Sequence, residues 1–188
     1  MLKRRFLLAL LIGCCGDDAQ AQTQTRTQTP ENPLSWHARY MYSGLKNFLV
    51  GSAEKMPEAH YSFKPAAEVR SYGQIIGHVA DAQYRFCSLV LDEANPAPNI
   101  EQTKSTKAEL IVALKEALAY CDRAYNGMTD ASAAELVKLG PGMPRLGVLT
   151  TNSLHTTLHY GNLVTYMRLK NVIPPSSDPT YFPPPPKR

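Results

Sequence analysis

Three histidines have the spacing and the surroundings that metal binding requires. His155 and His159 are four residues apart in a segment that we predict to be helical, so their imidazoles lie on one face, a turn apart. His78 borders the apolar face of another predicted helix and points into or beside the core. Each also has an ordinary explanation, as a surface histidine or as a core histidine bonded to a backbone carbonyl. Three inward imidazoles would repel one another when protonated, and sharing one divalent cation removes that conflict.

This ligand set predicts a type of chemistry. No fourth ligand is evident, so one coordination position would stay open, as in catalytic zinc sites. Three nitrogen ligands suit zinc, nickel, copper and iron comparably well, so spacing alone does not choose the metal. The sequence has no Ser-His-Asp arrangement, phosphate-binding glycine loop or C-x-x-C pair, which argues against hydrolases, nucleotide enzymes and thioredoxin-like proteins of those kinds.

Four further residues are weaker candidates for the surroundings of the metal. Asp81 lies one turn after His78 and could orient a ligand or a bound water, although a solvated helix-face carboxylate is more common. Arg85 could bind an anionic substrate or take part in a surface salt bridge. Asn162 and Tyr166 continue the face of the histidine pair and could line the pocket, though packing alone explains Tyr166.

Four long amphipathic helices are predicted to position these side chains. Their approximate ranges are 34–55, 71–93, 105–127 and 148–170. Ser71 and Gln74 form a capping box at the start of the second helix. A short helix is predicted at 132–139, and the following GPGMPRLG is predicted to be irregular. Without any β-hairpin signal, the pattern indicates an all-α protein with a four-helix bundle over residues 34–173.

The N-terminus has the composition of an export signal covering residues 1–21. Basic residues precede a short apolar stretch at 6–12, too short to span a membrane. Residues 11–14 read LIGC, a lipobox whose Cys14 would carry lipid and which we favour slightly. Residues 19–21 read AQA, a site for ordinary signal peptidase. We therefore expect export to the periplasm or cell envelope, with membrane attachment only through a lipid anchor.

The segments outside the bundle contribute most of the net charge. Residues 22–33 are polar and repetitive and are predicted to be a flexible tether, and residues 174–188 a proline-rich extended tail. The formal net charge is +4. Removing residues 1–13 leaves 17 Lys and Arg against 16 Asp and Glu, which is +1. This balance does not supply the basic surface that a nucleic-acid partner needs.

Two cysteines remain within the predicted bundle. Cys87 and Cys121 lie on helices that we expect to be neighbours. In an oxidising compartment the pair could form a disulfide, and the alternative is two buried thiols packed as small apolar groups.

Two segments resemble the DinB-like (damage-inducible) superfamily. Residues 70–86, RSYGQIIGHVADAQYRF, resemble its second-helix motif, and the segment from Leu154, LHTTLHYGNLVTYMRLKNVIPPSS, resembles its last helix. The resemblance covers roughly residues 34–176. It implies a four-helix bundle with a metal site that maps onto His78, His155 and His159.

The resemblance also implies zinc or nickel as the metal, a homodimer, and a small-molecule substrate that the sequence does not identify. Better-understood relatives are thiol-dependent S-transferases and isomerases, in which the metal lowers the pKa of the attacking thiol. The export signal departs from that pattern, because small cofactor thiols are scarce outside the cytoplasm. Two hypotheses follow: a metal-dependent transferase or hydrolase that activates a thiol or water, or a non-catalytic envelope protein whose metal is structural or absent.

Overall fold

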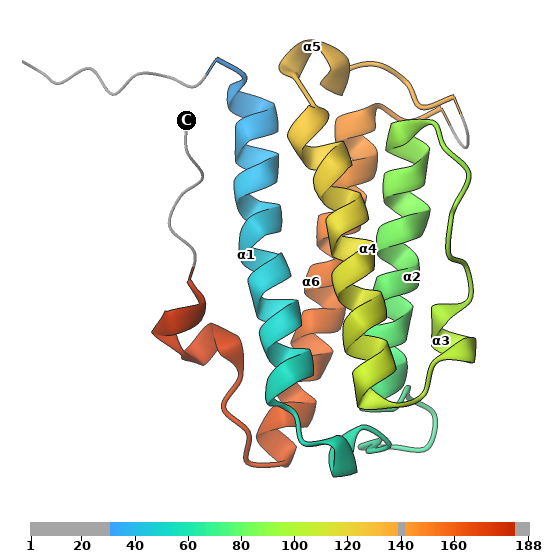
Figure 1. The fold of residues 1–188 in the computed structure, drawn as a ribbon. Helices are drawn as coiled ribbons and strands as arrows, with labels where there is room; N and C mark the ends of the chain where they lie inside the picture. The colour runs from blue at the N-terminus through green and yellow to red at the C-terminus, as the bar shows by residue number, and fades with distance from the viewer. Residues whose placement is uncertain (1–30, 139–141, 183–188) are drawn as a thin grey trace, which may run out of the picture.

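Four long helices build the protein (Figure 1). The computed structural model describes residues 31–138 and 142–182. The long helices are α1 (Pro33–Lys55), α2 (Tyr72–Leu91), α4 (Lys107–Gly127) and α6 (Arg145–Leu169). Each of α1 and α2 packs against both α4 and α6, so α1 and α2 lie diagonally opposite each other. The all-α fold and the four-helix bundle predicted from the sequence are confirmed.

The connection between α2 and α4 determines what lies beside α2. In Figure 1 both helices run in the same direction, so the chain must return along the length of α2 before α4 can begin. This return segment contains the short helix α3 (Ile100–Thr103), which packs against α2. The sequence pattern does not predict α3. Helix α6 runs antiparallel to α2, which brings the middle of one helix beside the middle of the other.

Side-chain caps define where two of the long helices begin. The Ser71 hydroxyl accepts a hydrogen bond from the Gln74 amide at 3.2 Å, and the Gln74 side chain accepts one from the Ser71 amide at 2.8 Å. The predicted capping box is therefore confirmed. Thr106 and Glu109 form the same reciprocal pair at the start of α4. Such caps satisfy amide groups that the first helical turn leaves without partners.

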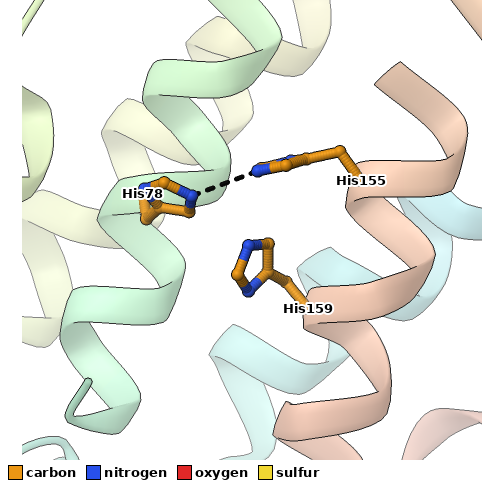
Figure 2. Close-up of side chains that lie close together, drawn as sticks. All are labelled: His78, His155 and His159. Atoms are coloured by element: carbon orange, nitrogen blue, oxygen red, sulfur yellow. Dashed lines mark hydrogen bonds between the residues drawn. The ribbon is translucent and has the colours of Figure 1, made fainter. Parts of the chain in front are cut away.

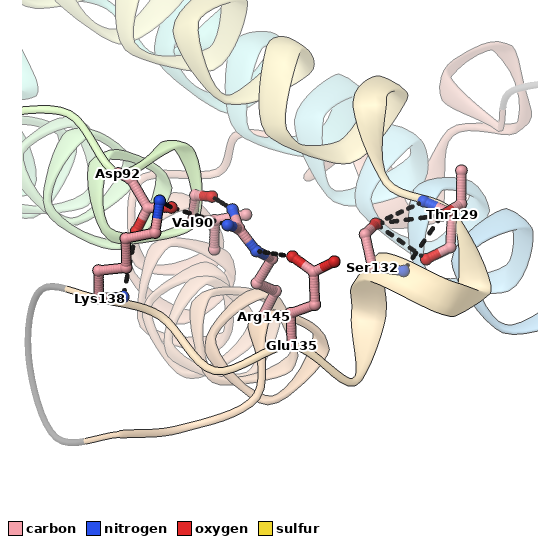
Figure 3. A network of polar contacts seen from close by, with 7 residues as sticks. All are labelled: Val90, Asp92, Thr129, Ser132, Glu135, Lys138 and Arg145. Atoms are coloured by element: carbon pink, nitrogen blue, oxygen red, sulfur yellow. Dashed lines mark hydrogen bonds and ion pairs between the residues drawn. The ribbon is translucent and has the colours of Figure 1, made fainter.

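Two helix boundaries differ from those predicted. Helix α5 covers only Asp130–Ala133, not 132–139, and α6 begins at Arg145, three residues earlier than expected. Residues 135–137 instead pair with the chain that enters α6, through Val137 N–H to Met143 C=O at 3.0 Å. The Arg145 side chain binds the Val90 carbonyl, Asp92 and Glu135, which fixes the first turn of α6 (Figure 3).

The chain after α6 folds back onto α1. The short 3₁₀ helices η2 (Pro175–Ser177) and η3 (Pro179–Tyr181) occupy part of the region expected to be an extended tail. The Ser176 amide donates to the Tyr160 hydroxyl at 2.8 Å, and Lys55 pairs with Asp178 at 3.0 Å. Gly51 permits this approach, because a Cβ there would lie 2.2 Å from the Tyr181 ring.

Several predicted features lie outside the described residues. They are the signal peptide with Cys14, the tether up to residue 30, and the tail from residue 183. None of the helices described is both long and apolar enough to cross a membrane. A third 3₁₀ helix, η1 (Glu58–His60), lies in the connection between α1 and α2.

The interior is apolar and cross-linked. A disulfide joins Cys87 of α2 to Cys121 of α4, with 5.3 Å between their Cα atoms. The bond links two long helices that follow each other in the chain, with only the short α3 between them. The core that contains it also includes side chains that are almost fully buried, among them Leu49, Tyr72, Ile76, Leu114, Leu118, Tyr125, Leu149, Leu163 and Met167. These side chains come from all four long helices, so the bundle has one shared core.

Candidate metal centre

The three predicted histidines meet between α2 and α6 (Figure 2). One ring nitrogen from each of His78, His155 and His159 lies within 4.8 Å of the corresponding nitrogens of the other two. The Nε2 atoms of His78 and His155 are 3.1 Å apart. The cluster is half-buried, with 24% of the His78 side chain exposed. The antiparallel packing of the helices allows one α2 residue to face an i,i+4 pair on α6.

A buried amide network beneath the histidines holds the two helices in register. The Gln83 side-chain amide donates to the Thr156 hydroxyl at 2.9 Å, and the Asn152 side-chain amide donates to Oε1 of Gln83 at 2.9 Å. All three residues are at most 2% exposed. A shift of α6 along α2 would leave these buried groups without partners. The network therefore fixes the position of α6 along the α2 axis, and with it which residues of the two helices face each other at the histidines. The sequence analysis did not identify this network.

A carboxylate supports His78 from the side away from the other two rings. Nδ1 of His78 lies 3.0 Å from Oε2 of Glu101, which is on α3. Arg70 donates to the other oxygen of Glu101 at 2.8 Å. A carboxylate on Nδ1 favours the tautomer that leaves the Nε2 lone pair free, as second partners of metal-binding histidines commonly do.

Asp81 acts on the site through the backbone. Its two carboxylate oxygens accept hydrogen bonds from the backbone amides of Ile100 and Glu101, at 2.7 and 2.9 Å. The sequence suggested that Asp81 could orient a ligand or water directly. The structure instead places it under the first turn of α3, where it positions the residue that binds His78. We therefore regard Asp81 as a positioning residue.

The environment keeps two of the imidazoles neutral at physiological pH. The pKa of His155 is lowered to about 4, mainly by burial and then by the adjacent rings of His159 and His78. Burial also lowers the pKa of His159, with a further contribution from His78. Neutral rings offer lone pairs instead of repelling charges, which is the state that metal binding needs.

The ring nitrogens are poorly satisfied by the protein itself. Nδ1 of His155 and Nδ1 of His159 are buried and have no hydrogen-bond partner among residues 31–138 and 142–182. A buried polar group in this state costs about 1–3 kcal/mol. Three imidazoles gathered around one gap, two of them kept neutral by their surroundings and the third held by a carboxylate, are a donor set that fits a divalent metal of the zinc or nickel type.

Two cavities give access to the cluster and contain the four weaker candidates. A cavity of about 600 Å³ is lined by His159, Asn162 and Tyr166. A second cavity, of about 380 Å³, is lined by His78, Asp81 and Arg85. Arg70 and Glu101 line both cavities. Asn162 and Arg85 are exposed, whereas Tyr166 is buried and its hydroxyl donates to the Arg70 carbonyl at 2.9 Å.

Glu101 and Arg70 are the site residues that the sequence analysis missed. Arg70 directly precedes the capping residue Ser71, and this position at the start of α2 could have indicated that Arg70 lies near the helix that carries His78. Glu101 is 23 positions after His78, beyond the proline-rich stretch that ends α2, and no sequence periodicity relates the two. Only the return of the chain along α2 brings them together.

Comparisons with known proteins show a family likeness over the part of the chain that contains the site. Residues 47–163 match the family described as the DinB superfamily, a range that contains all three histidines. Over 120 residues the chain is 26% identical to the uncharacterized protein YjoA of Bacillus subtilis (strain 168), covering 62% of this chain and 77% of that protein. The name of that relative states no activity, so this similarity suggests no particular reaction.

Proposed function

This chain belongs to the DinB superfamily, and from that premise we propose that it binds a divalent metal through His78, His155 and His159. We propose further that the metal is zinc or nickel and that it activates a thiol or a water, so the protein would act as a transferase or hydrolase. The observation that carries the proposal is the convergence of three ring nitrogens within 4.8 Å, two of them on imidazoles with lowered pKa values.

The chain's own residues would prepare the site in three ways. Glu101 would keep the proton of His78 on Nδ1 and its Nε2 lone pair toward the gap, and Arg70 holds Glu101 in place. The burial of His155 and His159 keeps them unprotonated. The two cavities leave room for a small molecule beside the rings. When bound, the metal would supply Lewis acidity, lowering the pKa of a thiol or water at its open position.

Elemental analysis tests the metal site directly. We expect protein purified without chelator to contain about one zinc or nickel per chain, and the double variant His155→Ala, His159→Ala to contain none. The double variant His37→Ala, His60→Ala is a matched control, because both of those residues lie outside the cluster. Wild-type protein without stoichiometric metal, or metal retained by the double variant of the cluster, would refute the proposal.

A second candidate function is a non-catalytic envelope protein with a structural metal. One observation favours it: of the carboxylates that line the two cavities, Asp81 is held by two backbone amides and Glu101 by His78 and Arg70, which leaves only Glu68 among the described residues there as a possible general base. Titration of cobalt-loaded protein with 2-mercaptoethanol separates the two functions. An open site gives new absorption bands as the thiol binds, and a closed structural site does not.

We also propose that the protein is exported. The support comes from the basic and apolar start of the chain, and from the Cys87–Cys121 disulfide, since such bonds persist mainly in oxidising compartments. Mass spectrometry of the mature N-terminus distinguishes a lipid-bearing Cys14 from a free Gln22. A chain that still begins at Met1 in the native host would contradict both forms of processing.

A further inference from the structure

Two cavities lined by histidines of the cluster share lining residues with each other, and one of them shares a residue with a third cavity. The cavity beside His159 and the cavity beside His78 have Arg70 and Glu101 in common. The cavity beside His78 shares Arg85 with a third, of about 280 Å³. The rest of this third cavity, which we call the apolar groove, is lined by Phe86, Leu89, Met143, Val148 and Thr151. Arg85 therefore lies between the second cavity and the groove and borders both.

Arg85 is the guanidinium in these cavities that other side chains do not neutralise. Arg70 is paired with Glu101, and the oxygens of Asp81 are taken by backbone amides. Arg85 is exposed and forms no ion pair with any residue in the described part of the chain. The sequence left open whether Arg85 is a surface salt-bridge partner or binds an anion. The structure supplies no carboxylate for the first role.

The guanidinium of Arg85 is held close to the histidines. Its central carbon lies 4.6 Å from the centre of the Phe86 ring, and that ring lies 5.9 Å from the His155 ring, centre to centre. Stacking on an aromatic face leaves the N–H groups at the edge of the guanidinium free to donate.

We propose that Arg85 determines substrate specificity by binding the carboxylate of a small amphipathic molecule whose apolar part lies in the apolar groove. This inference rests on the proposed metal function, because the metal would bind the reacting group of the same molecule. A single uncommitted guanidinium matches one planar carboxylate, with two parallel hydrogen bonds. Phe86 and Leu89 form the side of the groove next to Arg85, so charged and apolar parts of the substrate are recognised side by side.

Two thiol probes with the same aromatic part test the inference. They are 2-mercapto-3-phenylpropanoate, which carries a carboxylate, and 2-phenylethanethiol, which does not. Dissociation constants are measured by absorption with cobalt-loaded protein, after the cobalt content of each sample is determined. We expect wild type to bind the carboxylate probe about ten to one hundred times more tightly than the other, as a charge-assisted pair allows.

The variants decide whether Arg85 causes this preference. Arg85→Gln should bind the carboxylate probe no more tightly than 2-phenylethanethiol, with its affinity for 2-phenylethanethiol unchanged, and Arg85→Lys should retain part of the preference. The matched control is Arg123→Gln, because Arg123 also stacks on a neighbouring aromatic ring, that of Tyr120, but is paired with Glu93 on another face. This control should behave as wild type.

The possible failures are distinguishable. If the protein takes up cobalt and Arg85→Gln keeps the preference, or weakens both probes equally, the inference is wrong and the metal site stands. If inorganic phosphate displaces the carboxylate probe more effectively than phenylacetate does, the carboxylate assignment is wrong. If wild type takes up no cobalt and contains no other metal, the proposed function fails and the inference fails with it.

Discussion

Two clusters of polar side chains lie between α2 and α6, and they differ in how many of their polar atoms have hydrogen-bond partners within the protein. The inner cluster, Gln83, Asn152 and Thr156, is almost completely buried; its amide N–H groups and the Gln83 side-chain oxygen are hydrogen-bonded within the bundle, and Asn152 Oδ1 is its one atom without a partner among the described residues. The outer cluster, the three histidines, is half-buried, and two of its buried ring nitrogens have no partner in the described chain. The same pair of helices thus supports one polar group that is nearly complete and one that is not.

This difference separates a structural role from a binding role. A buried network with its hydrogen bonds in place fixes register and needs no ligand. A group of imidazoles with one ring nitrogen each directed at a shared gap offers lone pairs that a cation can bind. We therefore expect changes in the inner cluster to affect folding, and changes in the outer cluster to affect metal binding. The following predictions test that separation, from the largest expected effect to the smallest.

Metal removal should have the largest effect on the stability of the wild-type protein. A ligand at one thousand times its dissociation constant stabilises the folded state by about 4 kcal/mol. We expect EDTA to lower the urea unfolding midpoint of the wild type and to leave His155→Ala, His159→Ala unchanged. Equal midpoints for the wild type with and without EDTA would show that the outer cluster contributes nothing through a metal.

Gln83→Met should destabilise the fold without changing the metal content. The substitution keeps the volume but removes both amide hydrogen bonds and leaves the Asn152 amide poorly paired, which should cost about 2–4 kcal/mol. Urea unfolding of the metal-free protein measures the cost, and elemental analysis measures the metal. Loss of the metal from a variant that is as stable as the wild type would contradict the separation of the two clusters.

Glu101→Ala should weaken metal binding more than it weakens the fold. Loss of the carboxylate behind a metal-binding histidine typically lowers metal affinity by about 10–100-fold. Competition with a coloured zinc chelator measures the affinity. Glu93→Ala is the matched control, since Glu93 pairs with Arg123 on α4. Equal zinc affinities for the Glu101 and Glu93 variants would show that Glu101 does not support metal binding.

Asp81→Asn should have a smaller effect in the same direction. An asparagine can accept at only one oxygen, so one of the two amide hydrogen bonds to α3 is lost and Glu101 is positioned less well. We expect a loss of metal affinity of less than about tenfold, together with faster hydrogen exchange at Ile100 and Glu101. A loss of affinity without faster exchange would show that Asp81 acts by another route.

The metal-free protein should become less stable as the pH falls from about 6.5 toward 4. The folded pKa of His155 is about 4, below the ordinary 6.5 that the unfolded chain has, so the unfolded state takes up the proton first. The stabilising difference is complete above pH 6.5 and is lost as the pH approaches 4. Because the ring is half-buried, we expect a modest slope. NMR titration of His155 gives the midpoint, and His155→Asn should show a flatter profile than wild type.

Much of the fold could be predicted because local features determine it. The Ser71–Gln74 capping box and the four amphipathic periodicities depend on nearest neighbours in the chain, and the structure reproduces them. The i,i+4 spacing of His155 and His159 likewise places two rings on one face whatever the helix packs against. Where local preference and long-range contacts disagree, as at Arg145, the predicted boundary was wrong by three residues.

The immediate surroundings of the histidines were decided by tertiary structure. Glu101 supports His78 only because the chain returns along α2 through α3, and Asp81 serves α3 instead of a ligand for the same reason. The absence of an ion-pair partner for Arg85 in the described chain also depends on which carboxylates the fold engages elsewhere. The sequence alone therefore determined the four long helices and the three candidate ligands. Contacts between residues far apart in the chain decided which groups hold those ligands and which charge remains available beside them.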